Sequence, residues 1–130
     1  VLLAYSSRNR SASIRIPHTS NPKAKRVEVR FPDPAANPYL YMASQILSGL
    51  DGVDGRLDPG PSADTPYETK AALLPKSLRE AVFALQDDPF FRQALGAEFV
   101  DYYVHIKNAE IERFQAEVSD WEHREYFEMF

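Results

Sequence analysis

The sequence predicts an α+β domain in which short antiparallel strands come first and helices follow. Residues 13–16 and 26–31 alternate between apolar and polar side chains, the pattern of strands with one buried face. From residue 38 onward, apolar side chains recur every three or four positions behind helix-capping residues. We therefore expect one domain with strands in residues 1–37, a helix over 38–52, a loop over 53–74 and a helical tail over 75–130.

Length and composition are those of a small globular domain. The 130 residues are 44% hydrophobic and 26% charged, close to the averages of globular proteins. The formal net charge of −4 does not favour nucleic acid as a partner. Cysteine is absent, and no apolar run approaches the roughly 18 residues of a membrane helix. We expect a soluble, cytoplasmic protein without a signal peptide. Because the chain starts in an apolar run without methionine, we also expect it to be part of a larger protein.

Three segments are candidates for strands. Residues 1–5 are apolar and predict a strand or a buried extended segment. Residues 13–16 alternate, with the two isoleucines expected to face the core and Ser13 and Arg15 expected to face solvent. The connection that follows contains an Asn-Pro turn signal. We therefore expect residues 13–16 to pair antiparallel with residues 26–31.

The third segment carries the most informative charges. Arg26, Glu28 and Arg30 share one face of the expected strand, opposite a face formed by Val27, Val29 and Phe31. Two guanidinium groups beside a carboxylate can hold a phosphate or carboxylate, while the carboxylate itself binds a divalent cation. These are the requirements of phosphoryl transfer. The alternative is a solvated sheet face whose charges offset one another.

Neighbouring arginines weaken that alternative. The expected antiparallel pairing places Arg15 on the same face, and the preceding polar loop adds Arg10. An excess of arginines over carboxylates on one face is repulsive unless an anion occupies it. The sequence therefore favours an anion site.

The helices are predicted from their capping residues. Asn37 and Pro38 start the helix over 38–52, whose apolar stripe we expect to pack on the sheet. Further helices are expected behind the capping box at Ser77, behind Asp88-Pro89, from about residue 98 to 118, and behind Ser119. The last of them is expected to bring four aromatic side chains against an apolar surface: Trp121, Tyr126, Phe127 and Phe130.

Three runs of sequence carry a resemblance to a known family. They are SRNRSASIRIP over 7–17, PKAKRVEVRFPDPAANPYL over 22–40, and GLDG over 49–52. Together, and in this spacing, they resemble the carboxy-terminal catalytic region of bacterial type I glutamine synthetase. The similarity is dense over the first 55 residues and thins to a general helix layout beyond Pro59. It implies the α+β fold of that catalytic domain, of which this chain would be a part.

The resemblance implies an ATP site. Arg10, in the Asn-Arg-Ser element, is similar to an arginine that contacts ATP phosphates and the bound glutamate. Arg15, in the Ile-Arg-Ile-Pro element, and Lys23, after the turn proline, are similar to residues that contact the nucleotide, and Arg26 is assigned to the same nucleotide site.

The resemblance also implies a metal ligand and a glutamate site. Glu28 is similar to the carboxylate that ligates an active-site Mg²⁺ or Mn²⁺, and Arg30 to the arginine that holds the side-chain carboxyl of glutamate. Arg10 and Arg30 are thus the implied catalytic residues. The implied reaction joins ammonia to L-glutamate at the expense of ATP through γ-glutamyl phosphate.

The family's sites lie between subunits of a large ring, which implies a dodecamer for the full-length protein and only part of a site in this chain. Two alternatives stay open: a related ligase that joins glutamate to a larger amine or polyamine, and a non-catalytic structural fragment. Some relatives carry an adenylylated tyrosine in the loop that follows GLDG. Tyr67 falls near that place, but its surroundings, TPYET, depart from the family pattern.

Overall fold

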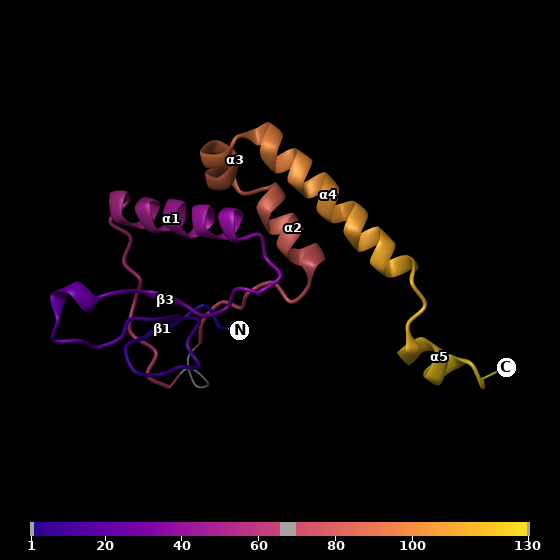
Figure 1. Ribbon diagram of the computed structural model, residues 1–130, viewed down its shortest axis with the longest axis horizontal. Helices are drawn as coiled ribbons and strands as arrows, with labels where there is room; N and C mark the ends of the chain where they lie inside the picture. Colours follow the sequence, from indigo (N-terminus) through magenta and orange to yellow (C-terminus); the bar gives the residue numbers. More distant parts are fainter. Residues whose placement is uncertain (1, 66–69, 130) are drawn as a thin grey trace. The chain divides into compact units, whose positions relative to one another are not determined.

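The structure is a computed structural model that describes residues 2–65 and 70–129. The chain forms two compact units, residues 1–74 and residues 75–130. The first unit contains β1 (Tyr5–Ser6), β2 (Ile14–Arg15), the 3-10 helix η1 (Pro22–Ala24), β3 (Glu28–Val29) and α1 (Pro38–Asp54). The second contains α2 (Leu78–Gln86), α3 (Pro89–Leu95), α4 (Ala97–Ala116) and α5 (Asp120–Tyr126) (Figure 1). The expected α+β class is confirmed.

The strands form one mixed sheet in the order β1-β2-β3. β2 and β3 pair antiparallel, with Ile14 opposite Val29 and Arg15 opposite Glu28, as predicted. β1 and β2 run parallel, with Tyr5 opposite Ile14, so the expectation of antiparallel pairing does not hold for this pair. Parallel strands normally need a crossover of a dozen or more residues. Here each strand has two residues and is only about 7 Å long, so a short turn can return the chain to the start of the next strand.

The strand faces are not covered as the alternation predicts. Ser13, expected in solvent, is 2% exposed, whereas Ile16 and Val27, expected in the core, are 44% and 60% exposed. The Ser13 hydroxyl donates to the Ala4 carbonyl oxygen at 2.8 Å and accepts from the Ala4 N–H at 3.1 Å, so it is buried with its hydrogen bonds made. The two apolar side chains flank strands of two residues, and so small a sheet cannot bury both of its faces.

Helix α1 starts as predicted and packs less than predicted. The Asn37 side chain accepts hydrogen bonds from the N–H groups of Tyr39 and Leu40, and Pro38 follows at the first helical position. No residue of α1 is buried, however, and Ile46 is 62% exposed. A helix of 17 residues is about 25 Å long and cannot be covered by strands of about 7 Å. The expectation that α1 packs on the sheet is wrong within the described chain.

The segment after α1 is held against the first strand. The Ala63 N–H donates to the Tyr5 carbonyl oxygen at 2.8 Å, and Ala63 is 4% exposed. The Tyr5 hydroxyl donates to the Gly60 carbonyl oxygen at 2.8 Å. Gly60 has a φ of +73°, a conformation that glycine adopts without a steric penalty. This part of the expected surface loop is therefore an ordered neighbour of β1.

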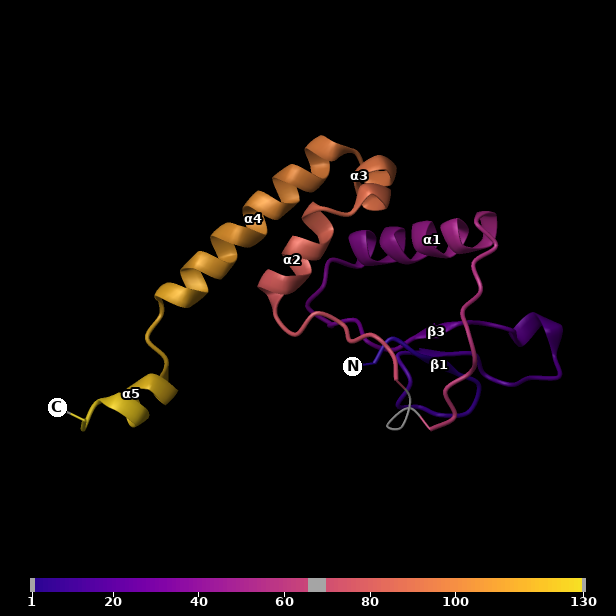
Figure 2. The same cartoon turned by 180° about the vertical axis from the view of Figure 1, so that it is seen from behind.

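The second unit has a small helical core. α2 packs against α4, as both Figure 1 and the reverse view in Figure 2 show. The buried side chains are Val82, Val100, Val104 and Ile111. Phe114 of α4 is 80% exposed, although α2 reaches the last turn of α4, where Arg79 donates to the side chain of Gln115 at 2.7 Å.

Helix α3 is held to α4 by an ion pair. Arg92 Nη1 lies 2.6 Å from Asp101 Oδ1, and Nη2 lies 3.3 Å from Oδ2. This two-pronged contact is the geometry that arginine and carboxylate favour.

Helix α5 has the predicted capping box, with both hydrogen bonds between Ser119 and Glu122 formed. Trp121 and Phe127 are not packed as expected, because they are 56% and 79% exposed, and Phe130 lies outside the described residues. Trp121 instead meets Tyr126 edge to face, with ring centroids 5.8 Å apart. Among the helices of the described residues, none is both long and apolar enough to span a membrane.

Candidate functional site

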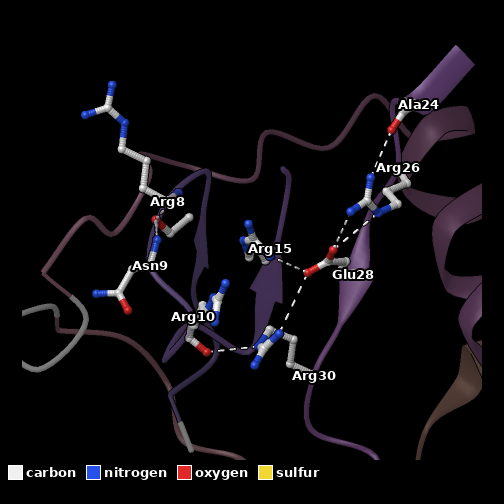
Figure 3. Close-up of polar contacts among 9 residues, drawn as sticks. Arg8, Asn9, Arg10, Arg15, Ala24, Arg26, Glu28 and Arg30 are labelled. Atoms are coloured by element: carbon white, nitrogen blue, oxygen red, sulfur yellow. Dashed lines mark hydrogen bonds and ion pairs between the residues drawn. The ribbon is translucent and has the colours of Figure 1, made fainter. Parts of the chain in front are cut away.

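Glu28 on β3 is the centre of the candidate site (Figure 3). It lies opposite Arg15 on β2, and opposed residues of an antiparallel pair project to the same face. Arg15 Nη1 lies 2.9 Å from Oε2 of Glu28, and Arg26 Nη2 lies 3.0 Å from Oε1. Arg30 Nη1 is 3.7 Å from Oε2. We call these four residues the Glu28 cluster.

The arginines determine the charge state of the carboxylate. Partial burial acts to raise the pKa of Glu28, but the charge and hydrogen bond of Arg15, followed by those of Arg26, outweigh it. The pKa of Glu28 therefore lies below its ordinary value, and the carboxylate is ionised at neutral pH. Three guanidinium groups surround this one carboxylate, so the cluster keeps an excess of positive charge.

One donor of the cluster, the Nε atom of Arg15, is buried without a hydrogen-bond partner in the described structure. A buried donor of a charged group without a partner is costly. An anion oxygen could reach this covered atom only if neighbouring atoms moved, so it is the excess of positive charge that suits an anion.

The turn between β1 and β2 brings Arg10 to the cluster. The Arg10 carbonyl oxygen accepts a hydrogen bond from Arg30 Nε at 2.9 Å, which Figure 3 also shows. The backbone of Arg10 is thus fixed beside the cluster, and its own side chain is exposed to solvent. Arg10 and Arg30 thus meet through the backbone of Arg10, and their common role stays a prediction.

Lys23 lies apart from the cluster. It is exposed on η1, and its backbone N–H donates to the side chain of Asn21 at 3.0 Å. Beside Arg26 there is instead an open groove of about 440 Å³, within the size range of small-molecule sites. The lining residues are Ser7, Ile16, Pro17, His18, Thr19, Lys25 and Arg26. Lys25, which the sequence did not single out, therefore lines a possible ligand volume.

The described residues offer only part of the ligand set that a divalent cation needs. Glu28 is an ionised oxygen ligand of the kind that Mg²⁺ and Mn²⁺ prefer, but both of its oxygens face guanidinium groups. Within residues 2–65 and 70–129, no three His, Cys, Asp or Glu side chains are grouped to hold a metal ion. These residues therefore fit an anion and supply one ligand for a cation.

Comparison with known proteins decides the family. Residues 1–126 match the family model "Glutamine synthetase, catalytic domain". The chain belongs to the glutamine synthetase family. It is 51% identical over 125 residues to a glutamine synthetase of Bradyrhizobium diazoefficiens, a match that covers 88% of this chain and 27% of that protein. Identity to a glutamine synthetase of Vibrio cholerae is 46% over 138 residues, covering 98% of this chain and 29% of that protein.

A solved structure agrees with this family assignment. The structure described as "Apo GmaS without ligand" matches with a TM-score of 0.85 and 34% identity, covering 98% of this chain and 30% of that one. The chain thus spans less than a third of the length of the glutamine synthetases and of the structure that it matches.

Most residues that the resemblance to glutamine synthetase singled out come together in space. Arg15, Arg26, Glu28 and Arg30 form the Glu28 cluster, Arg10 joins it through its carbonyl oxygen, and Lys23 does not reach it. Their roles toward ATP, metal and glutamate stay predictions. Tyr67 lies outside the described residues.

Sequence reasoning missed Ser6 and Asp64, which stabilise the turn that carries Arg10. Ser6 is fully buried, and its hydroxyl contacts both the following turn and Asp64. The hydrogen bonds between Ser6 and the following turn could have been predicted from the sequence, because a serine before a polar stretch is typical of a side-chain-stabilised turn. The contact between Ser6 and Asp64 could not have been predicted in this way, because it joins residues 58 positions apart.

Proposed function

We propose that this chain forms part of the active site of a glutamine synthetase that joins ammonia to the γ-carboxylate of L-glutamate. The γ-carboxylate oxygen attacks the terminal phosphorus of ATP and ADP leaves, giving γ-glutamyl phosphate. Ammonia then attacks the acyl carbon and phosphate leaves. The observation that carries the proposal is the Glu28 cluster, a face with an excess of arginine charge, in a chain of this family.

Each part of the cluster has a proposed task. Arg15 and Arg26, with Lys23 and Arg10, bind ATP; Arg26 lines the groove beside the cluster, which supports its part. Arg10 and Arg30 bind glutamate and the transferring phosphoryl group, whose charge their guanidinium groups stabilise. Glu28 orients the arginines and supplies one ligand to Mg²⁺ or Mn²⁺, with the remaining ligands outside this chain.

The full-length protein is proposed to be a cytoplasmic homo-oligomer, the dodecamer of the family, whose other subunits and upstream segments complete the site. Ammonia is the preferred acceptor, because the relatives that are 46–51% identical to this chain are named glutamine synthetase. A larger amine or polyamine as acceptor, and a non-catalytic role, are the alternatives that an assay must exclude.

The test is an assay of the full-length protein with ATP, glutamate, Mg²⁺ and either ammonia or a panel of amines. We expect phosphate release that depends on both glutamate and ammonia, and a product with the mass of glutamine. Faster turnover with a larger amine would assign the chain to the related ligase. Absence of turnover with every acceptor would support the non-catalytic alternative.

A further inference from the structure

A turn of the backbone carries Arg10 to the Glu28 cluster, and a buried serine shapes it. Ser6 is 0% exposed, and its Oγ accepts hydrogen bonds from the N–H groups of Arg8 at 3.2 Å and Asn9 at 3.1 Å. Beyond Arg10, the N–H of Ser11 donates to Asn9 Oδ1 at 2.8 Å. The backbone on both sides of Arg10 is thus held by the side chains of Ser6 and Asn9.

Both of these side chains converge on one distant residue. The Ser6 hydroxyl donates to Asp64 Oδ1 at 3.3 Å, and Asn9 Nδ2 donates to the Asp64 carbonyl oxygen at 3.1 Å. The next residue back, Ala63, is buried and bonded to the Tyr5 carbonyl oxygen, which fixes Asp64 relative to β1. These hydrogen bonds to Asp64 therefore attach the Arg10 turn to the segment after α1.

The direction of the Ser6 hydroxyl is the critical point. A hydroxyl has one proton and two acceptor lone pairs. Because the proton is directed at Asp64, the lone pairs are left to accept from Arg8 and Asn9. On the far side of the turn, the Arg10 carbonyl oxygen accepts from Arg30. Asp64 is thus connected to the Glu28 cluster by its hydrogen bonds with Ser6 and Asn9, by the backbone from Asn9 to Arg10, and by the Arg10–Arg30 hydrogen bond. Figure 3 labels Asn9, Arg10 and Arg30.

We propose that Asp64 is a positioning residue that acts through Ser6 and Asn9 to hold Arg10 at the anion site. The inference rests on the proposed function of Arg10, to which it adds a residue outside the motifs. Without Asp64, the Ser6 hydroxyl rotates freely and the turn loosens, so Arg10 is displaced without being changed itself. Displacements of about 1 Å at a reacting group can cost on the order of 10²-fold in rate.

The test compares Asp64→Ala with Asp64→Asn in the full-length protein. Asp64→Ala removes the carboxylate that accepts from Ser6 and leaves the backbone carbonyl that accepts from Asn9. We expect kcat/KM for glutamate to fall on the order of tenfold or more. Asp64→Asn keeps a side-chain carbonyl oxygen that can accept from Ser6, so this variant should keep most of the wild-type kcat/KM for glutamate. Asp58→Ala is the matched control, because Asp58 lies in the same segment but accepts only from the nearby Gly60 N–H in the described structure. It should leave kcat/KM near that of the wild type.

Two further measurements separate positioning from general support. In an Arg10→Ala background, Asp64→Ala should cost less than it does in the wild type, because the part of its effect that passes through the Arg10 side chain is lost while the Arg10 carbonyl–Arg30 hydrogen bond remains. Amide hydrogen exchange of residues 7–11 should accelerate in Asp64→Ala and not in Asp58→Ala, whether or not the protein makes glutamine. If Asp64→Ala does not fold, Asp64→Glu, which shifts the carboxylate by one methylene, replaces it. Unchanged exchange in residues 7–11, or an equal loss of activity in the Arg10→Ala background, would overturn the inference.

Discussion

Replacing Glu28 by glutamine tests the centre of the proposed site. The change keeps the size of the side chain and removes its charge. In the structure, Oε1 faces Arg26 at 3.0 Å and Oε2 faces Arg15 at 2.9 Å. A glutamine retains one acceptor oxygen and presents an NH₂ group in place of the other. Glu28→Gln therefore leaves either Arg26, or both Arg15 and Arg30, facing a donor instead of an acceptor.

The size of the effect follows from what the carboxylate does. Three guanidinium groups lose their shared counter-charge, and a divalent cation loses its one ligand from this chain. We expect the catalytic constant of the full-length enzyme to fall on the order of 10²-fold or more, the scale for removing one electrostatic stabiliser of a transition state. The affinity for Mg²⁺ should fall as well. Folding should survive, because a side chain that is 24% exposed allows water to solvate the freed arginines.

The assay is steady-state glutamine formation at varied Mg²⁺ and glutamate concentrations. Glu112→Gln on α4 is the matched control, since it makes the same chemical change at an exposed position and should leave the kinetics unchanged. Arg30→Lys is a second comparison: it keeps the charge and loses the planar fork, so it should raise the KM for glutamate more than the requirement for Mg²⁺. Wild-type activity and metal dependence in Glu28→Gln would mean that the Glu28 cluster is a solvated surface.

Three further predictions concern stability and completeness. The purified 130-residue chain alone should form no glutamine, because the proposed metal site takes only Glu28 from the described residues and the chain spans less than a third of the length of its relatives; turnover free of host enzyme would contradict this. Because the pKa of Glu28 is lowered in the folded state, its contribution to stability is present above the ordinary carboxyl pKa and is lost as pH falls through the lowered pKa. The difference in unfolding temperature between wild type and Glu28→Gln should accordingly vanish in acid. Val100→Ala, at a fully buried position, should destabilise the helical unit by about 2 kcal/mol in denaturant unfolding, and more than Phe114→Ala, which truncates a larger but 80% exposed side chain.

The features that sequence reasoning predicted correctly depend on neighbours in the chain. The caps at Asn37 and Ser119 are local hydrogen bonds between residues two or three positions apart, and both are formed. The pairing of Arg15 with Glu28 depends on one turn and on strand alternation. The motif resemblance and this pairing together were enough to predict which residues form the Glu28 cluster.

The features that it missed depend on what covers each face. Alternation places Ile16 and Val27 on defined sides of a strand, but it does not supply the element that buries them. Ser13 is buried because its hydroxyl finds both polar groups of Ala4, a pairing across the β1–β2 turn that no local pattern encodes. The contacts of Asp64 with Ser6 and Asn9 were missed for the same reason, because they join distant segments of the chain.

The contact between Asp64 and the Arg10 turn has a consequence for the order of folding. Its hydrogen bonds join residues 55 and 58 positions apart, whereas the caps of the helices join residues three positions apart. Closing a long loop costs entropy before the contact can stabilise it, so distant pairings form slowly. The helical unit should therefore acquire structure early in refolding, and the anion site should be the last part to assemble. A ligand-binding signal should then lag behind the recovery of helical circular dichroism.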